Sequence, residues 1–149
     1  MINTDILIIG AGPTGLFTVF EAGLLKLRCH LIDSLPIPGG QCSEIYPKKP
    51  IYDIPSRQIV TGQELTNELM KQISPFNPKF HLNQQVCKIE KSNHGWTVQT
   101  TVGTEIESKC IVIAAGAGSF VPRKPQIENI GYFLFADSTS EVKLGRAEG

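Results

Sequence analysis

Three glycines and one carboxylate near the start of the chain have the types and spacing that can hold a dinucleotide. Gly10, Gly12 and Gly15 form the pattern Gly-x-Gly-x-x-Gly, and Asp33 follows further along. In such a turn the first glycine allows a sharp bend, the second lets backbone approach a pyrophosphate, and the third lets a helix lie close to a strand. The carboxylate is placed to accept hydrogen bonds from a ribose diol. The pattern indicates a nucleotide site, and the alternative is a purely structural strand–turn–helix.

The flanking segments predict the elements that position these residues. The apolar run 5–9 predicts a strand, Pro13 suits the first helical turn, and 28–32 predicts a second strand. A helix crossover makes the two strands parallel, and the helix start offers free N–H groups to an anion. The expected apolar face of the helix consists of Leu16, Phe17, Val19, Phe20 and Leu24.

Composition indicates an ordinary globular chain. Its 149 residues suffice for one domain with a core, and 41% are hydrophobic against 19% charged. Lys plus Arg and Asp plus Glu both number 14, which gives bulk electrostatics no role in binding nucleic acid or membranes. Because no signal segment or apolar run of ~20 residues is visible, we expect a soluble cytoplasmic protein.

The cysteines and histidines offer no recognisable redox or metal motif. The four cysteines, Cys29, Cys42, Cys87 and Cys110, include no Cys-x-x-Cys pair, and the three histidines include no pair at helical spacing. Cys29 and Cys110 fall in strand-like runs, where we expect small buried thiols. The phosphate loop Gly-x4-Gly-Lys and the motif Gly-x-Ser-x-Gly are also absent. We therefore predict no metal site, no hydrolase and no nucleoside triphosphatase.

A long Pro- and Gly-rich loop follows Asp33. Its composition argues against regular structure over 34–42, and it either wraps a ligand or is a surface connection stiffened by prolines. Thr61 and Glu64 then form a capping box for a helix that ends before Pro75. A short strand is expected over 79–82.

The last third of the predicted domain reads as a three-stranded antiparallel meander over 84–90, 95–101 and 105–109. The meander is the crossover to an apolar strand over 110–114, which we expect to be covered on both faces and to end in a small-residue turn. This order predicts an α/β fold, a Rossmann-like FAD-binding domain with a parallel sheet and a meander crossover. A nicotinamide-binding Rossmann domain would continue with further strand–helix units instead.

Several segments resemble the FAD half of ferredoxin–NADP reductases of the thioredoxin-reductase-like type. They are Gly39-Gly40-Gln41, Tyr46-Pro47, Ile51-Tyr52-Asp53-Ile54, Thr61-Gly62-Gln63-Glu64-Leu65 and the run from Ala115 to Lys124. The resemblance implies an incomplete FAD-binding domain over 1–127 and a divergent tail over 128–149. Thioredoxin reductases share this architecture but carry a Cys-x-x-Cys pair, which this chain lacks.

The resemblance also implies roles for particular residues. It assigns Gly10, Gly12, Thr14 and Gly15 to the pyrophosphate, Asp33 to the ribose, Gln41 and Tyr46 to the flavin end, the backbone of Val86 to adenine, and Phe120 to the isoalloxazine. No acid–base residue is implied in this half. The implied chemistry is hydride transfer from NADPH to FAD, followed by single-electron steps to ferredoxin or flavodoxin, in a homodimer.

The departures from the family leave alternatives open. Chains of this family are roughly twice as long, in keeping with two domains of ordinary size, and a second Gly-x-Gly-x-x-Gly for NADPH is missing here. A natural truncation, a frameshifted tail and an artificial end all fit the sequence after about residue 130. The alternatives for function are an FAD-binding module without catalysis of its own and a thioredoxin-reductase-like flavoprotein that lacks the dithiol.

Overall fold

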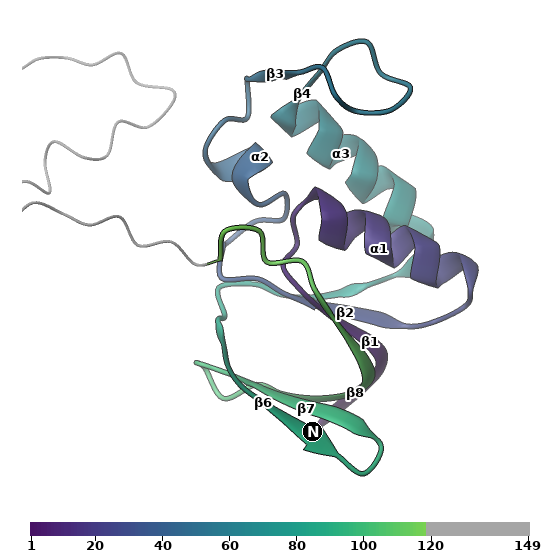
Figure 1. Cartoon of the computed structure of the whole chain (residues 1–149), viewed down its shortest axis with the longest axis vertical. Helices are drawn as coiled ribbons and strands as arrows, with labels where there is room; N and C mark the ends of the chain where they lie inside the picture. Colours follow the sequence, from purple (N-terminus) through teal and green to yellow (C-terminus); the bar gives the residue numbers. More distant parts are fainter. Residues whose placement is uncertain (119–149) are drawn as a thin grey trace, which may run out of the picture. The chain divides into compact units, whose positions relative to one another are not determined.

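The structure, a computed structural model, describes residues 1–118 (Figure 1). The elements in chain order are β1 (Ile2–Ile9), α1 (Pro13–Leu24), β2 (Cys29–Ile32), α2 (Gln41–Glu44), β3 (Pro50–Ile51), β4 (Val60–Thr61), α3 (Gly62–Ile73), the 3-10 turn η1 (Ser74–Phe76), β5 (Lys79–His81), β6 (Val86–Ser92), β7 (Gly95–Thr100) and β8 (Glu105–Ile113). The predicted strand–helix–strand start is therefore present. No helix among these residues is long and apolar enough to cross a membrane.

One six-stranded sheet organises the described residues, in the order β5-β2-β1-β8-β7-β6. The strands β5, β2, β1 and β8 run parallel, and the register aligns Ile9 with Ile32 on one side and Ile113 on the other. The strands β8, β7 and β6 continue the sheet as an antiparallel meander. Figure 1 shows α1 and α3 together on one side of β1 and β2, with the β6–β7 hairpin curling away at the other end of the sheet. The predicted Rossmann-like class with a meander is confirmed.

The division between the meander and the last core strand is not where the sequence predicts it. Segments 105–109 and 110–114 were expected to be two strands, but β8 is continuous from Glu105 to Ile113. Its first part pairs antiparallel with β7 as far as Ser108, while the whole strand pairs parallel with β1. The same strand can serve both sheet regions because each edge of a strand hydrogen-bonds independently.

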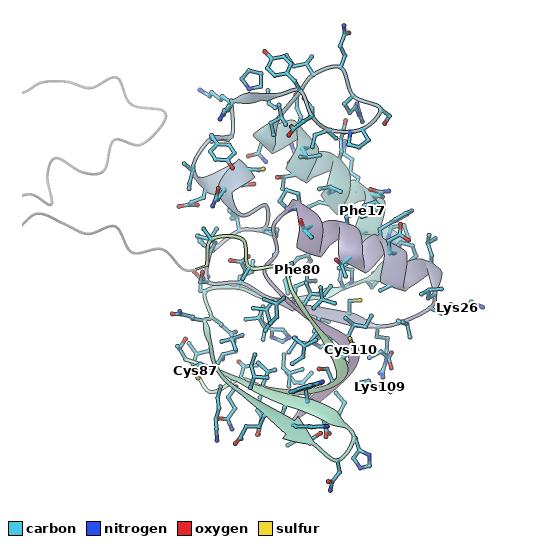
Figure 2. The ribbon with its side chains drawn as sticks, viewed as in Figure 1. Phe17, Lys26, Phe80, Cys87, Lys109 and Cys110 are labelled. Atoms are coloured by element: carbon cyan, nitrogen blue, oxygen red, sulfur yellow. The ribbon has the colours of Figure 1, made fainter. Side chains whose placement is uncertain are left out.

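The apolar end of β8 is less covered than its composition suggests. Ile113 is 73% exposed, and Cys110 is exposed beside Lys109 (Figure 2). Within the described residues, the pairing of β8 with β7 ends at Ser108. Residues 109–113 therefore have a strand partner only in β1. The expectation of a strand covered on both faces, with a buried Cys110, is wrong for these residues. Cys29 is buried, as predicted.

Helix α1 packs on the sheet through a narrower stripe than predicted. Gly15, Val19 and Ala22 are buried, at the i, i+4, i+7 spacing that gives one helical face. Phe17 and Leu24 lie seven residues apart on the opposite side and are 46% and 59% exposed. Their inclusion in the predicted buried face is therefore wrong, because apolar character alone does not say which side of a helix meets the sheet.

The loop after β2 contains more regular structure than expected. Helix α2 begins at Gln41, inside the segment where prolines and glycines argued against it, and β3 pairs antiparallel with β4 further on. Helix α3 has the predicted capping box: the Glu64 N–H donates to Thr61 Oγ1 at 3.2 Å, and the Thr61 N–H donates to Glu64 Oε2 at 2.9 Å. The bond from the Thr61 N–H, and then a bond from the Thr61 hydroxyl to Glu64 Oε2 at 2.9 Å, lower the pKa of the Glu64 carboxyl.

Candidate dinucleotide-binding site

The turn between β1 and α1 requires glycine at its first position. Gly10 has a φ of +107°, and its N–H donates to the Ile32 carbonyl at 2.8 Å. A Cβ added to Gly10 would lie 2.3 Å from the carbonyl oxygen of Ala114 and 3.0 Å from Cα of Ala115. The bend therefore lies directly against Ala114 and Ala115, where a second glycine-rich turn begins after β8.

Glycine at position 15 is required for close packing of helix on strand. An added Cβ there would lie 2.0 Å from the carbonyl oxygen of Gly10 and 3.3 Å from the Ile8 side chain. No side chain fits in that space, so the first turn of α1 rests on the end of β1. This is the contact that the third glycine of such a turn provides.

The folded chain gives no comparable reason for glycine at position 12. Gly12 has an ordinary φ of −74°, and an added Cβ would meet nothing closer than Cα of Gly40, at 3.9 Å. Gly40 itself adopts a φ of +58° and faces Gly12. Two stretches of bare backbone thus lie opposite each other, with open space beside Gly12.

The N-terminus of α1 adjoins this space. Gly12 is its N-cap, Pro13 occupies the first turn, no side chain caps the helix, and the first turn has no acidic residue. Thr14 is exposed, and the amide of Leu16 bonds back to the Gly12 carbonyl at 2.9 Å. Uncapped N–H groups and the helix dipole favour an anion at this end.

Asp33 lies at the carboxyl end of β2 and is already engaged with backbone. Its Oδ2 accepts from the Ala11 N–H at 2.6 Å, and its Oδ1 accepts from the Leu35 N–H at 2.9 Å. The carboxylate therefore ties the glycine turn to the end of β2, a role that the sequence did not reveal. Each carboxylate oxygen can accept more than one hydrogen bond, so the predicted ribose contact stays compatible with these two.

The segment before β6 runs beside the end of β2. The Gln84 N–H donates to the Asp33 carbonyl at 3.0 Å, and the Asn83 N–H donates to the Leu35 carbonyl at 3.1 Å. Val86 follows as the first residue of β6, with its half-buried side chain packed on the cluster around Ile32. The structure thus brings the Val86 segment near Asp33, and its contact with adenine stays a prediction.

Gln41 and Tyr46 are brought together, and α2 is held next to the glycine turn. The Tyr46 hydroxyl donates to Gln41 Oε1 at 3.1 Å, and Gln41 is the first residue of α2. Just before it, the buried Gly39 donates its N–H to the Ala11 carbonyl at 2.8 Å. Gly39 has a φ of +119°, which lets the loop bend back onto the turn.

A cavity lies between residues 42–54, in the segment after β2, and the helices α1 and α3. Its volume is about 490 Å³, and its wall includes Pro13, Cys42, Tyr46, Lys49, Tyr52 and Leu65. Because Pro13 directly follows Gly12, the cavity adjoins the glycine turn. The loop therefore forms one wall of a cavity beside the candidate site, which favours the ligand-wrapping interpretation over a plain surface connection.

The second glycine-rich turn follows β8. The Gly118 N–H donates to the Ala115 carbonyl at 2.8 Å, and Gly116 has a φ of +56°. The Ala114 N–H donates to the Ile9 carbonyl at 2.8 Å, which holds the start of this turn beside the end of β1. Phe120, assigned to the isoalloxazine by resemblance, lies outside the described residues.

Thiols and imidazoles supply no further catalytic or metal centre within residues 1–118. All four cysteines are free, and burial raises the pKa of the Cys42 thiol beside the cavity. His30 Nδ1 and His81 Nε2 lie 2.9 Å apart on neighbouring strands, a pair that helical spacing could not predict, and burial lowers the pKa of both. No group of three ligating side chains exists among the described residues.

Comparison with known proteins places this geometry in a family context. The model of the family described as pyridine nucleotide-disulphide oxidoreductase matches residues 4–148. Ferredoxin–NADP reductase 1 of Christiangramia forsetii is 61% identical over 131 residues, which cover 87% of this chain and 37% of that protein. Ferredoxin–NADP reductase of Parvibaculum lavamentivorans is 55% identical over 130 residues, covering 87% and 38%. The chain thus spans less than two fifths of the length of these relatives.

Solved structures agree on the fold. Thioredoxin reductase from Streptococcus pyogenes superposes with a TM-score of 0.67 at 26% identity, over 88% of this chain and 40% of that one. Thioredoxin reductase from Lactococcus lactis superposes with a TM-score of 0.68 at 23% identity, over 87% and 41%. The fold of this chain is therefore shared with these two thioredoxin reductases.

Proposed function

The chain belongs to the pyridine nucleotide-disulphide oxidoreductase family, and from this premise we propose that it is the FAD-binding part of a ferredoxin–NADP reductase. The observation that carries the proposal is the open backbone at Gly12. There the fold has no steric or conformational need for glycine, although Gly10 and Gly15 beside it are both required by packing. A pyrophosphate that approaches the backbone at the uncapped start of α1 accounts for that glycine.

The residues present fit FAD. Gly12 and the first turn of α1 would hold the pyrophosphate, Asp33 would take the ribose with its remaining acceptor capacity, and the segment of Val86 would lie along the adenine. Gln41 and Tyr46 would hold the flavin end, next to the cavity beyond Pro13. Bound FAD supplies hydride and single-electron transfer chemistry, while these residues bind and orient it.

The relatives' names support a proposal for the activity of the whole protein. Proteins named ferredoxin–NADP reductase are 52–61% identical to this chain over the matched residues. We infer electron transfer between NADPH and ferredoxin or flavodoxin through FAD as the activity of the whole protein, and this chain spans 38% of the Parvibaculum lavamentivorans relative. A homodimer is a prediction that rests on the resemblance alone, and a cytoplasmic location stays the prediction made from the sequence.

The alternative is an FAD-binding module without catalysis of its own. It stays open because the 149 residues contain one Gly-x-Gly-x-x-Gly, the motif proposed above to hold FAD. An NADPH oxidation assay with ferredoxin or a dye acceptor separates the two proposals, since turnover by this chain alone rejects the module. A thioredoxin-reductase-like activity is disfavoured because the chain has no Cys-x-x-Cys pair.

Titration with FAD tests the proposal. The 149-residue chain is expected to quench flavin fluorescence, and Gly12→Val is expected to weaken binding by roughly 100-fold, which corresponds to ~2.7 kcal/mol. The added isopropyl group fills the open space beside the helix start but meets no protein atom at the Cβ position closer than 3.9 Å.

Gly12→Ala is the matched control, because its single methyl group should weaken binding by less while the thermal unfolding midpoint of both variants stays close to wild type. Equal FAD affinity in wild type and Gly12→Val would mean that the turn is structural. A wild-type chain that never takes up FAD would reject the proposed function outright.

A further inference from the structure

Lys49 lies against the ring of Tyr46, at the wall of the cavity beside the glycine turn. Its ammonium nitrogen is 5.3 Å from the centroid of the Tyr46 ring, within the range of a cation–π contact. Both side chains line the 490 Å³ cavity. Tyr46 is thus held from two directions, by Lys49 over its ring and by Gln41 at its hydroxyl.

The backbone that carries Lys49 is fixed to α3 and to the aromatic residue itself. The Lys49 N–H donates to the Tyr46 carbonyl at 3.1 Å, and the Lys49 carbonyl accepts from the Gly62 N–H at 3.3 Å. The Gln63 N–H donates to the Pro47 carbonyl at 2.9 Å. The turn from Tyr46 to Lys49 is therefore anchored on the first turn of α3, which limits where the ammonium can go.

Within residues 1–118, Lys49 forms no ion pair with an acidic side chain. Each ion pair among the described residues involves other side chains, and none has Lys49 as a member. Asp53 lines the same cavity, but its side chain is exposed and forms no ion pair with Lys49. Lys48 carries the same charge one residue earlier, yet it does not line the cavity or contact the Tyr46 ring.

We propose that Lys49 is a positioning residue for the flavin end of the cofactor. The Lys49 side chain holds the Tyr46 ring and places a positive charge beside the cavity. The inference rests on the proposed function and deepens it. Two electrons and one proton convert FAD to its anionic reduced form, and a nearby positive charge binds that form more tightly than the neutral oxidised one. Lys49 therefore raises the reduction potential of bound FAD.

The test compares two variants that each remove one positive charge, Lys49→Gln and Lys48→Gln, in the 149-residue chain loaded with FAD. Lys49→Gln is expected to lower the ratio of the affinities for reduced and oxidised FAD by about tenfold. For this two-electron couple the reduction potential of bound FAD then falls by ~30 mV. Dithionite titration against a dye of known potential measures it. Lys48→Gln should leave the potential unchanged, and Lys49→Arg should restore it because a guanidinium keeps the cation over the ring.

The outcomes separate the inference from the function on which it rests. If wild type and both variants bind FAD with one common potential, Lys49 has no such role, although the FAD site stands. If Lys48→Gln shifts the potential as much as Lys49→Gln, the effect is general electrostatics and the inference falls. If the wild-type chain takes up no FAD, the proposed function fails and the inference fails with it.

Discussion

The two glycine-rich turns that meet at the carboxyl ends of β1 and β8 differ in what requires their glycines. At the first turn, packing excludes any side chain at Gly10 and Gly15, where added Cβ atoms would lie 2.3 and 2.0 Å from backbone oxygens. At the second turn, Gly116 and Gly118 have positive φ values, but added Cβ atoms would meet no atom of residues 1–118 within 4 Å. Among the residues that the structure describes, tertiary packing requires the glycines of the first turn, whereas local conformation requires those of the second.

The two turns thus show two structural reasons for glycine, which cannot be told apart in the sequence. A glycine required by packing fails when any atom is added, whereas one required by φ tolerates alanine at a modest cost. Gly12 is a third kind, since neither packing nor φ demands it. Three substitutions, in decreasing order of expected effect, test these distinctions and the contact between the strands that carry the two turns.

Gly15→Val is expected to cause the largest loss of stability. Its Cβ would collide with the Gly10 carbonyl, so α1 would have to move away from β1, at a cost of about 3 kcal/mol or more. Urea unfolding followed by circular dichroism measures this loss. Gly12→Val is the control with the same side chain three residues earlier, and equal midpoints for the two variants would contradict the packing argument.

Asp5→Asn is expected to cost about 2 kcal/mol, because the Asp5 carboxylate, midway along β1, joins that strand to Lys109 of β8 and to Arg28 just before β2. It accepts from Lys109 Nζ at 2.8 Å and from the Arg28 N–H at 3.0 Å. The bond from Lys109, then those from Arg28, hold the pKa of Asp5 well below its ordinary value.

That lowered pKa predicts the pH dependence. The stabilisation by Asp5 is complete above its unfolded pKa of ~4 and is lost as pH falls through the lower folded value. The difference in unfolding free energy between wild type and Asp5→Asn should therefore shrink from pH 7 to pH 3. A difference that grows on acidification would show that the ion pairs of Asp5 with Lys109 of β8 and with Arg28 just before β2 do not stabilise the fold.

Gly116→Ala is expected to have the smallest effect, a loss of about 1 kcal/mol from placing a Cβ at positive φ. Thermal unfolding of the variant beside Gly15→Val measures the contrast between the two turns. A loss as large as that of Gly15→Val would mean that the second turn is packed as tightly as the first, and the distinction drawn from the added Cβ contacts would be wrong.

Local signals in the sequence predicted local structure well. The turn after β1, the helix start at Pro13 and the capping box of Thr61 and Glu64 are all present, because each depends on residues within one turn of chain. The fold class followed from the order of these elements. What the sequence could not predict depends on contacts between distant residues.

The missed features of the site are tertiary contacts. The bond from the Ala11 N–H to Asp33 and the bond from Gly39 to the Ala11 carbonyl both join separate segments. The two consecutive glycines at positions 39 and 40 were the available signal, since a pair with positive φ indicates a loop that folds back. The continuity of β8 was hidden because its two halves have different compositions and different partners.

The pairing of β1 with β8 sets when the site can form during synthesis. The Lys109 and Asp5 side chains that pair across these strands are 104 residues apart in the chain. At about 5–20 residues per second, β1, α1 and β2 emerge roughly 5–20 s before β8. Until then Gly10 lacks the Ala114 carbonyl against which it packs, and β1 has one open edge. The two glycine-rich turns can therefore meet only after β8 has been synthesised.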